Sequence, residues 1–233
     1  MFAQLRRDLE AARSRDPAAR SSLEIVLAYP GVHAIWAYRI NHRLWGHDLR
    51  LLARWGSSIA QVLTGVDIHP GASLGSGIFI DHATGVVIGE TAEVGDDVTI
   101  YQGVTLGGTN LEHGKRHPTI GDRVTIGAGA KILGPITIGD DSRIGANAVV
   151  VKSVPPNSVV VGVPGQIIAR SSTRRESTPL DLQDTLMPDL VGLSLQSLLR
   201  RVDDLETLVK GERSEGDVRP SASGVWSGED FSI

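Results

Sequence analysis

A large aliphatic residue returns every six positions through the middle of the chain. The series is Ile68, Leu74 and Ile80, then Ile88, Val94, Ile100 and Leu106, then Ile120, Ile126, Ile132, Ile138, Ile144 and Val150. Neither a helical period of 3.6 residues nor the two-residue alternation of a strand accounts for this spacing. A fixed short period indicates stacked coils, each burying its side chain against the next. With three such units to a coil, the pattern predicts a mostly β protein, a parallel β-helix of triangular section.

The regions on either side of the repeat follow other patterns. Before the repeat, apolar residues fall at helical spacing, so we predict an N-terminal helical region over 1–63 and the β-helix over 64–168. The remaining residues, 169–233, begin as a polar linker. Within them, a 4-3-4-3-4 apolar spacing predicts a helix over about 189–210. That helix would either join a coiled coil or lie on its own protomer, and a disordered tail would follow it.

Composition and charge exclude several classes of protein. The 233 residues include no cysteine, which removes disulfides and thiolate metal sites. A net charge of −4 gives no nucleic-acid signature. The chain has no apolar run long enough to span a membrane, and its polar N-terminus lacks the core of a signal peptide. We therefore expect a cytoplasmic protein that binds neither nucleic acid nor membrane.

The six-residue count first breaks after Ile80, where two residues are extra. The break carries Asp81 and His82 in the sequence DHATG, and Asp67 lies upstream in VDIHP. Asp67 and His82 are fifteen residues apart, close to one coil, so we expect them to meet on one face. A carboxylate bonded to Nδ1–H would leave Nε2 of His82 free as a general base near neutral pH. His69, beside a turn proline, is interpreted as structural.

The count breaks again after Leu106, where eight extra residues lengthen the segment that reads GGTNLEHGKRHPT. A loop thrown out of a regular solenoid costs closure entropy and usually has a use. Arg116 and His117 stand at its far end, and an arginine fork is suited to a substrate carboxylate. His113 and His117 offer an alternative as metal ligands, but no third ligand is placed beside them.

Three motifs, VDIHP, DHATG and RHP, stand together in this chain within the longer segments 66–109, 115–134 and 154–165. These segments resemble bacterial serine O-acetyltransferase, a hexapeptide-repeat acyltransferase with a left-handed β-helix. The likeness covers about residues 16–170, and the three motifs together are specific to this enzyme within its superfamily. The resemblance implies transfer of acetyl from acetyl-CoA to the hydroxyl of L-serine, the first step of cysteine synthesis.

The resemblance also implies roles for individual residues. His82 would take the proton from the serine hydroxyl, and Asp67 would orient His82. Carboxylates would hold the substrate ammonium, and basic residues would hold the substrate carboxylate or close the site. Glu90 is a lesser candidate for the site. The substrate-binding residues implied in this way are Asp16, Asp81, Arg116 and His117.

The acetyl-CoA site implied by the resemblance runs along the prism between subunits. A Gly-Gly pair would let a thin cofactor approach the backbone, and the family transfers acetyl directly, so no metal is expected. The implied residues are Gly107, Gly108, Thr109, Ala128, Gly129 and Lys131. The family's sites form between the protomers of a trimer, and free L-cysteine inhibits it by occupying the serine site.

Two regions leave the assembly open. The N-terminal helical region is short beside the long bacterial form, whose extra helices pair trimers into hexamers, so both a trimer and a dimer of trimers are considered. The chain ends in Ile233 on the sequence EDFSI. Family members often insert a terminal isoleucine into O-acetylserine sulfhydrylase, although a terminal isoleucine also occurs by accident.

Three other functions compete with this interpretation. An O-acetyltransferase for a sugar or another small hydroxyl acceptor would share the histidine, but it has no reason to combine Asp16, Asp81 and Arg116. A zinc carbonic anhydrase of the same fold needs three placed histidines, which the spacing does not supply. A scaffold that docks a sulfhydrylase without catalysis would have no need of both His82 and Asp67.

Overall fold

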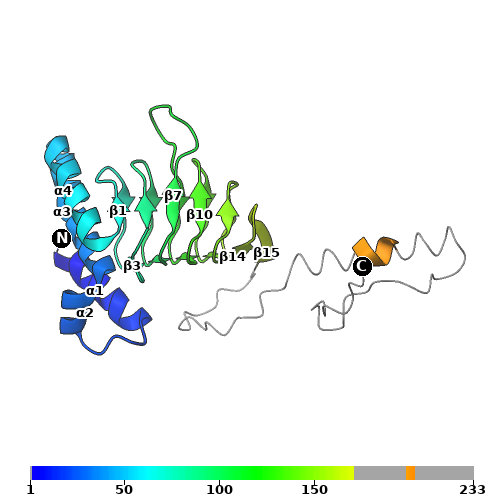
Figure 1. Ribbon diagram of the computed structural model, residues 1–233, viewed down its shortest axis with the longest axis horizontal. Helices are drawn as coiled ribbons and strands as arrows, with labels where there is room; N and C mark the ends of the chain where they lie inside the picture. The colour runs from blue at the N-terminus through cyan, green and yellow to red at the C-terminus, as the bar shows by residue number, and fades with distance from the viewer. Residues whose placement is uncertain (1, 171–197, 203–233) are drawn as a thin grey trace, which may run out of the picture. The chain divides into compact units, whose positions relative to one another are not determined.

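The computed structural model describes residues 2–170 and 198–202. Four helices come first and gather at one end of a stack of coils (Figure 1). Within the described ranges, no helix is both long and apolar enough to cross a membrane. The helices are α1 (Phe2–Arg15), α2 (Ser22–Ala28), α3 (Pro30–Gly46) and α4 (Arg50–Thr64).

Fifteen short strands follow the helices in the described part of the chain. Most contain two residues, because each coil bends after every third of a turn. The strands are β1 (Asp67–Ile68), β2 (Ser73–Leu74), β3 (Phe79–Ile80), β4 (Val87–Ile88), β5 (Glu93–Val94), β6 (Thr99–Ile100), β7 (Thr105–Gly107), β8 (Thr119–Ile120), β9 (Thr125–Ile126), β10 (Lys131–Leu133), β11 (Thr137–Ile138), β12 (Arg143–Ile144), β13 (Val149–Val150), β14 (Ser158–Val161) and β15 (Gln166–Arg170).

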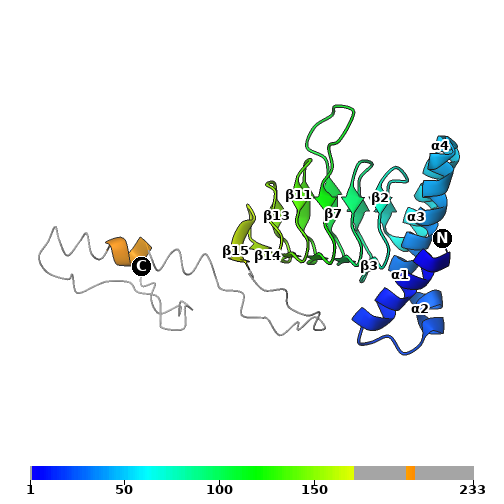
Figure 2. The same ribbon diagram turned by 180° about the vertical axis from the view of Figure 1, so that it is seen from behind.

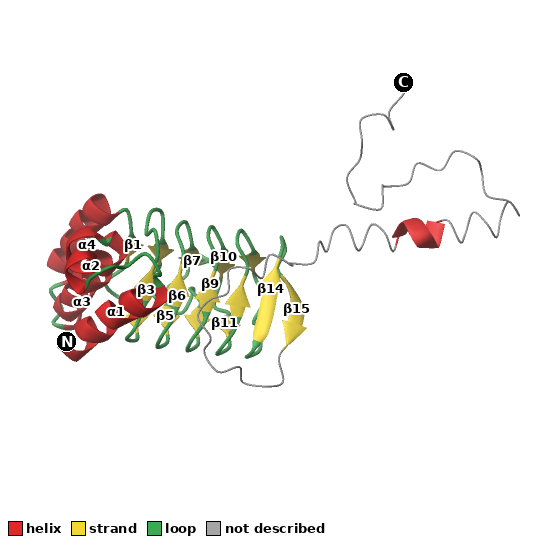
Figure 3. Cartoon of the chain, turned by 90° about the horizontal axis from the view of Figure 1, so that it is seen from below, coloured by secondary structure: helices red, strands yellow, loops and turns green. Residues whose placement is uncertain are grey.

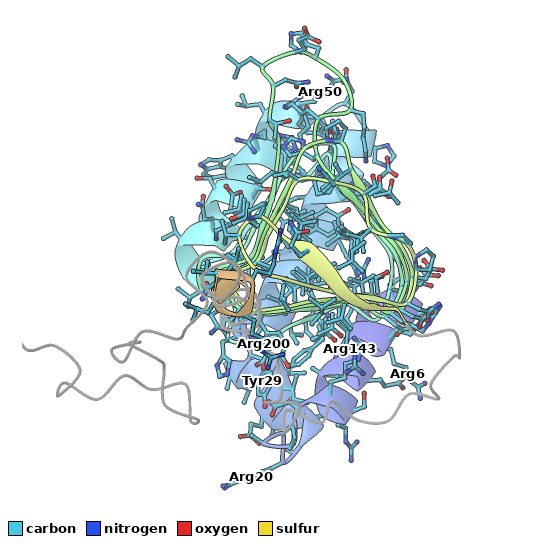
Figure 4. The ribbon with its side chains drawn as sticks, turned by 90° about the vertical axis from the view of Figure 1, so that its right-hand side faces the viewer. Arg6, Arg20, Tyr29, Arg50, Arg143 and Arg200 are labelled. Carbon is cyan, nitrogen blue, oxygen red and sulfur yellow. The ribbon has the colours of Figure 1, made fainter. Side chains whose placement is uncertain are left out.

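The strands form three sheets, which are the faces of a triangular prism (Figures 3 and 4). Face A has the order β1-β4-β7-β10-β13, face B has β11-β8-β5-β2, and face C has β15-β14-β12-β9-β6-β3. Neighbouring strands are parallel except for β14 and β15, which close the stack as an antiparallel pair. We name the corners by the faces they join: in the first coil, residues 69–72 form the A–B corner, 75–78 the B–C corner and 81–86 the C–A corner.

The strand register measures the length of each coil. Val87 pairs with Thr105, eighteen residues on, which is the regular coil. Asp67 pairs with Val87, twenty residues on, and Thr105 pairs with Lys131, twenty-six residues on. The two extra residues of the first irregular coil therefore lie at the C–A corner, and the eight extra residues of the second lie at the A–B corner. That second loop rises above β7 in Figure 2.

The recurring aliphatic residues form the core of the prism, as predicted. All thirteen are buried, and the most accessible of them, Leu74, is only 8% exposed. Burying a side chain of this size stabilises a fold by roughly 1.5–3 kcal/mol. Phe79 stands beside the inward-facing Ile80 and packs instead in a second cluster with Ala12, Ile25 and Val32 of the helices. This outward-facing aromatic side chain is one reason why the helices cover the first coil.

A buried ion pair also ties the helices to the first coil. Asp8 of α1 is fully buried, and its two carboxylate oxygens accept hydrogen bonds from Nε and Nη2 of Arg39 in α3 at 2.7 and 2.8 Å. Asp8 Oδ1 also accepts the backbone N–H of Gly77 at 3.0 Å, and Arg39 donates to the carbonyl of Gly75 at 2.8 Å. Both charged groups therefore have further hydrogen bonds to the backbone of the first coil, which help a buried charge to be tolerated.

The chain beyond the prism is described only at residues 198–202, which are helical. The rest of the helix predicted over about 189–210, the tail that follows it and Ile233 lie outside the described residues. The division into 1–63, 64–168 and 169–233 accordingly stays a prediction. Helices α1–α4 and the prism belong to one compact unit of the chain.

Candidate active site

The C–A corner of the first coil presents Asp81 and His82 to solvent. His82 and Ala83 both have φ of 53°, in the left-handed region that costs a non-glycine residue about 1–2 kcal/mol. The side chain of His82 is 73% exposed, and its Nε2 lies 3.9 Å from Oδ2 of Asp81. The same conformation recurs at other bends of the prism, as at Asp97, Arg123 and Asp141, so it belongs to the turning of the coil. The two extra residues of this coil thus hold an imidazole away from the prism, where a substrate can reach it.

The expected contact between Asp67 and His82 is not found in the part of the chain that the structure describes. This coil holds twenty residues and not about eighteen, so Asp67 stacks on Val87, five positions beyond His82. The corner that carries His82 lies beside the end of α4 instead, where Gly85 N–H donates to the Gly65 carbonyl at 2.8 Å. The role of Asp67 as the group that orients His82 stays a proposal.

Asp16 lies directly after α1, and both of its carboxylate oxygens are held. Oδ1 accepts the backbone N–H of Ala18 at 2.7 Å, and Oδ2 accepts the hydroxyl of Tyr29 at 2.5 Å. The pKa of Tyr29 is raised to about 12 by burial, then by the hydrogen bond and charge of Asp16, with Glu24 and Asp81 adding to it. The phenol therefore stays a hydrogen-bond donor at every ordinary pH.

Asp16 and Asp81 come from different elements, but the charges of both reach the same two tyrosines. Asp16 and Asp81 both raise the pKa of Tyr29, and after burial the same two charges raise the pKa of Tyr101. Over residues 2–170, neither carboxylate has a lysine or arginine within ion-pair distance. We call Asp16, Tyr29, Asp81, His82 and Tyr101 the acidic half-site, because it offers two uncompensated carboxylates beside an exposed imidazole.

The far end of the long loop is bound to the A–B corner of the coil before it. Nη2 of Arg116 donates to Oε2 of Glu90 at 2.5 Å, and this guanidinium lowers the pKa of Glu90. The neighbouring Lys115 donates to the carbonyl of Thr91 at 2.8 Å and pairs with Glu93 at 3.0 Å. These contacts fix the return of the loop, so that Arg116 is held by a partner and is still partly exposed.

The hydroxyl of Thr91 organises His117. It accepts the backbone N–H groups of Arg116 and His117 at 3.0 and 3.2 Å, so its own hydrogen is free for Nδ1 of His117 at 2.9 Å. Thr91 N–H also points at Nδ1, at 3.2 Å. Nδ1 is thus an acceptor, and the neutral imidazole carries its hydrogen on Nε2. Burial, and then the charge of Arg116, lower the pKa of His117. We call Glu90, Thr91, Arg116 and His117 the basic half-site.

The remaining histidines near this corner have ordinary structural contacts or none. His69 accepts the Gly71 N–H on Nδ1 at 3.0 Å and packs edge-on against Trp45, with ring centroids 5.1 Å apart. His113 is exposed in the long loop. Across the described ranges, no three His, Asp or Glu side chains come together as a metal site would require.

The residues implied for acetyl-CoA lie at both ends of the same two strands of face A. Gly107 ends β7 and Gly108 approaches the side chain of Arg116, whereas Lys131 begins β10 and donates to the Gly103 carbonyl. One position of the C–A corner has no side chain in three successive coils, because it is a glycine in the left-handed region. The three glycines are Gly85, Gly103 and Gly129, with φ of 77°, 69° and 71°. Ala128 and Gly129 stand in this column, and Thr109 lies near Gly134 on the loop side.

The predicted site residues therefore fall into two half-sites at different corners of one prism. Asp16, Asp81 and His82 stand at the C–A corner, and Arg116 and His117 stand at the A–B corner. Viewed along the coils, Tyr29 lies at the side of the prism away from the long loop (Figure 4). In the described residues no hydrogen bond or ion pair joins the two half-sites, and one chain does not bring all the predicted residues together.

Sequence reasoning missed three residues of these half-sites. Tyr29 had a signal, since it stands immediately before the Pro30 that separates two helices, where a side chain is fixed by both. Thr91 and Tyr101 had none, because a hydroxyl beside a repeat position looks the same whether it faces solvent or a returning loop.

Comparison with known proteins identifies the class of the molecule first. The model of the bacterial transferase hexapeptide family, with six repeats, matches residues 117–152. Serine acetyltransferase of Mycobacterium tuberculosis is 62% identical over 233 residues, which is the whole of both chains. The chain therefore belongs to the serine acetyltransferase family.

Solved structures agree with this assignment. Serine acetyltransferase of Neisseria gonorrhoeae in complex with serine is 49% identical with a TM-score of 0.70, over 72% of this chain and 69% of that one. A serine acetyltransferase in complex with cysteine is 46% identical with a TM-score of 0.72, over 73% and 66%. The stacked coils are thus the left-handed parallel β-helix of hexapeptide transferases, as predicted from the repeat and the resemblance.

Proposed function

We propose that this protein transfers the acetyl group of acetyl-CoA to the hydroxyl of L-serine, giving O-acetylserine and CoA, as the first step of cysteine synthesis. Family membership supports the reaction. The observation that carries its detail is the acidic half-site, where two carboxylates without a cationic partner stand beside an exposed imidazole. A sugar acceptor has no ammonium group for such a pair to bind.

The chemistry follows from His82. Its Nε2 takes the proton of the serine hydroxyl while the oxygen attacks the thioester carbonyl carbon. The carbon–sulfur bond then breaks, and the imidazolium returns the proton to the CoA sulfur. A positioned general base of this kind contributes ~10²–10⁴-fold to a rate. No metal enters any step, and Asp67 is proposed to steady the imidazole when the site is assembled.

Substrate recognition divides between the two half-sites. Asp16 and Asp81 would hold the serine ammonium, since charge-assisted hydrogen bonds are the strong ones. Arg116 would hold the serine carboxylate with the donors that Glu90 leaves free, and His117 would offer Nε2–H beside it. L-cysteine has the same ammonium and carboxylate as L-serine, which supports its place as an inhibitor at this site; a solved relative carries cysteine.

We infer that the complete site forms between two copies of the chain within a trimer. One chain carries the two half-sites at different corners, so the acidic half-site of one protomer would face the basic half-site of its neighbour. The outer surface of α4 supports the association. It carries a stripe of large apolar side chains that are exposed in a single chain, and a second copy of the chain could cover them. These are Leu51, Leu52, Trp55, Ile59, Val62 and Leu63. A dimer of trimers is the alternative assembly.

Acetyl-CoA would lie along face A and the glycine column of the C–A corner. Gly107, Gly108 and Thr109 border its loop end, and Ala128, Gly129 and Lys131 border the other. Lys131 is the one cation among the six, and a strongly anionic co-substrate would draw its ammonium. Cytoplasmic location and docking of a sulfhydrylase onto Ile233 complete the proposal.

The reaction is tested by thiol release from acetyl-CoA with L-serine. We expect turnover by the wild type and a loss of about 10²–10⁴-fold in kcat for His82→Ala. His47→Ala, at the exposed end of α3, is the control and should behave as wild type. With 3-hydroxypropionate, which lacks the ammonium, turnover should be negligible. A wild type that uses this acceptor as well as serine would contradict the proposal.

The shared site is tested by mixing two inactive variants. His82→Ala and Arg116→Ala each spoil a different half-site, so refolding or coexpressing them together should restore up to about a quarter of the wild-type sites in a symmetric trimer. Light scattering should give the mass of three or six chains. No recovery of activity in confirmed mixed oligomers would place the whole site within one protomer.

A further inference from the structure

Tyr29 is the one side chain, among the described residues, that hydrogen-bonds the carboxylate of Asp16. The other contact of that carboxylate is local, from the backbone of Ala18 in the turn after α1. The 2.5 Å distance between Tyr29 Oη and Asp16 Oδ2 is that of a charge-assisted O–H···O⁻ bond. Apart from these two hydrogen bonds, the orientation of the Asp16 side chain depends on the backbone of its own turn.

The backbone of Tyr29 is fixed at the junction of two helices. Tyr29 ends α2, where its N–H donates to the Ile25 carbonyl at 3.2 Å, and it also begins α3, where its carbonyl accepts Val32 N–H at 3.1 Å. Pro30 follows at the first helical position, where its fixed φ suits the helix. The side chain of Tyr29 therefore extends from a junction whose backbone is fixed by both α2 and α3.

The same junction is pressed against the strand that leads to Asp81. A Cβ on Gly31 would stand 2.0 Å from the carbonyl oxygen of Ile80, so the start of α3 lies in direct contact with the backbone of β3. Ile80 is the residue before Asp81. Tyr29 and Asp81 are thus placed by two segments in contact. The backbone before Asp16 is anchored separately, because Arg15 donates to the carbonyl groups of Gly77 and Val98 at 3.1 and 3.3 Å, so Tyr29 sets the orientation of the Asp16 side chain and not the place of its backbone.

We propose that Tyr29 is a positioning residue of the serine site, which holds the Asp16 carboxylate beside Asp81 so that both face one ammonium group. Two like charges in one site repel each other, and without a fixed donor the Asp16 side chain would turn away from Asp81 toward solvent. The hydroxyl of Tyr29 prevents this by holding Oδ2 of Asp16. The inference rests on the proposed function, since it names how that function selects a substrate with an ammonium group.

Tyr29→Phe tests this directly, because it removes the hydroxyl and keeps the ring that packs among the helices. We expect the KM for L-serine to rise about tenfold, the equivalent of ~1.4 kcal/mol, with kcat and the KM for acetyl-CoA within about twofold of wild type. The calorimetric Kd of L-cysteine should weaken by a similar factor. Tyr38→Phe is the matched control: its hydroxyl donates to the buried Ala72 carbonyl at 2.6 Å, so its loss should lower Tm without changing the KM for serine.

A double-mutant cycle with Asp16→Asn separates positioning from direct contact. If Tyr29 acts through Asp16, adding Tyr29→Phe to Asp16→Asn should change the KM for serine by less than about twofold. Fully additive effects would overturn the proposal, as would a Tyr29→Phe enzyme that loses Tm like Tyr38→Phe and keeps its KM. A wild type that neither binds nor acetylates serine would instead overturn the proposed function itself.

Discussion

Gly89 lies against the imidazole of His117 so closely that a Cβ on Gly89 would stand 2.0 Å from both Cδ2 and Nε2 of the ring. Gly89 follows the recurring aliphatic Ile88, and His117 returns to it only after the long loop. The glycine has an ordinary backbone conformation, so its side chain is missing to make room and not to allow a turn. The buried position of His117 and its contact with Thr91 both depend on that space.

Gly89→Ala should therefore expel the imidazole from its place. We expect the free energy of unfolding to fall by about 1–3 kcal/mol, as for an overpacked core, and the KM for serine to rise while turnover of bound substrate changes less. Urea denaturation and steady-state kinetics measure the two effects. Gly46→Ala is the matched control, since a Cβ there meets nothing within 4 Å; equal effects at both glycines would contradict the explanation.

The hydroxyl of Thr91 should matter more than its methyl group. Thr91→Val keeps the shape but leaves the N–H groups of Arg116 and His117 without their acceptor, at a cost of about 1–3 kcal/mol per unsatisfied buried group. Hydrogen exchange at residues 115–117 should accelerate, and the KM for serine should rise. Thr91→Ser restores the hydroxyl and should restore both measurements. A valine variant that behaves like the serine variant would show that the loop is held by other contacts.

Among the charged groups of the helical region, removal of one partner of the buried Asp8–Arg39 pair should lower the free energy of unfolding the most. Asp8→Ala leaves Arg39 buried without its partner, and we expect a loss of about 3–5 kcal/mol in the free energy of unfolding. Glu10→Ala breaks the exposed pair with Arg6 on the same helix and should cost less than about 1 kcal/mol. Chemical denaturation compares them; a similar small loss for both would mean that water reaches the buried pair.

Acid should destabilise the protein before its carboxylates titrate. The pKa values of His69 and His117 are lowered in the folded chain, mainly by burial, from an ordinary value of 6.5. Protons therefore bind the unfolded chain more readily, so stability is full above about pH 6.5 and is lost as the pH falls below it. Denaturation at a series of pH values should show this slope, and His117→Gln should reduce it. His47→Gln, at an exposed position, should leave it unchanged.

The repeat allowed most of the prism to be predicted, because the period of six and the burial of one residue in each unit are both local properties. The positions of the two breaks were also predictable, since an extra residue anywhere else would have shifted a buried side chain to the surface. Asp16 was reached only through resemblance. It stands in a polar turn, and nothing in its neighbourhood in the sequence shows that it ends beside Asp81.

Contacts between coils could not be predicted in the same way. The expected meeting of Asp67 and His82 assumed a coil of about eighteen residues. The two extra residues that revealed the site also changed which residues stack on one another, so Asp67 stacks on Val87. The bond between Thr91 and His117 depends on where the long loop returns, which its length alone does not determine. The role proposed for Tyr29 depends on where its hydroxyl group points, and a sequence pattern does not give the direction of a side chain.

Coils of eighteen, twenty and twenty-six residues stand in one stack without a change in the pairing of their strands. Each strand takes its place from the strand below it and not from the number of residues between them. Length added at a corner is therefore invisible to the interior. Such a corner can be lengthened, shortened or exchanged as a separate part, and new chemistry can be tried at the surface of this protein without folding it anew.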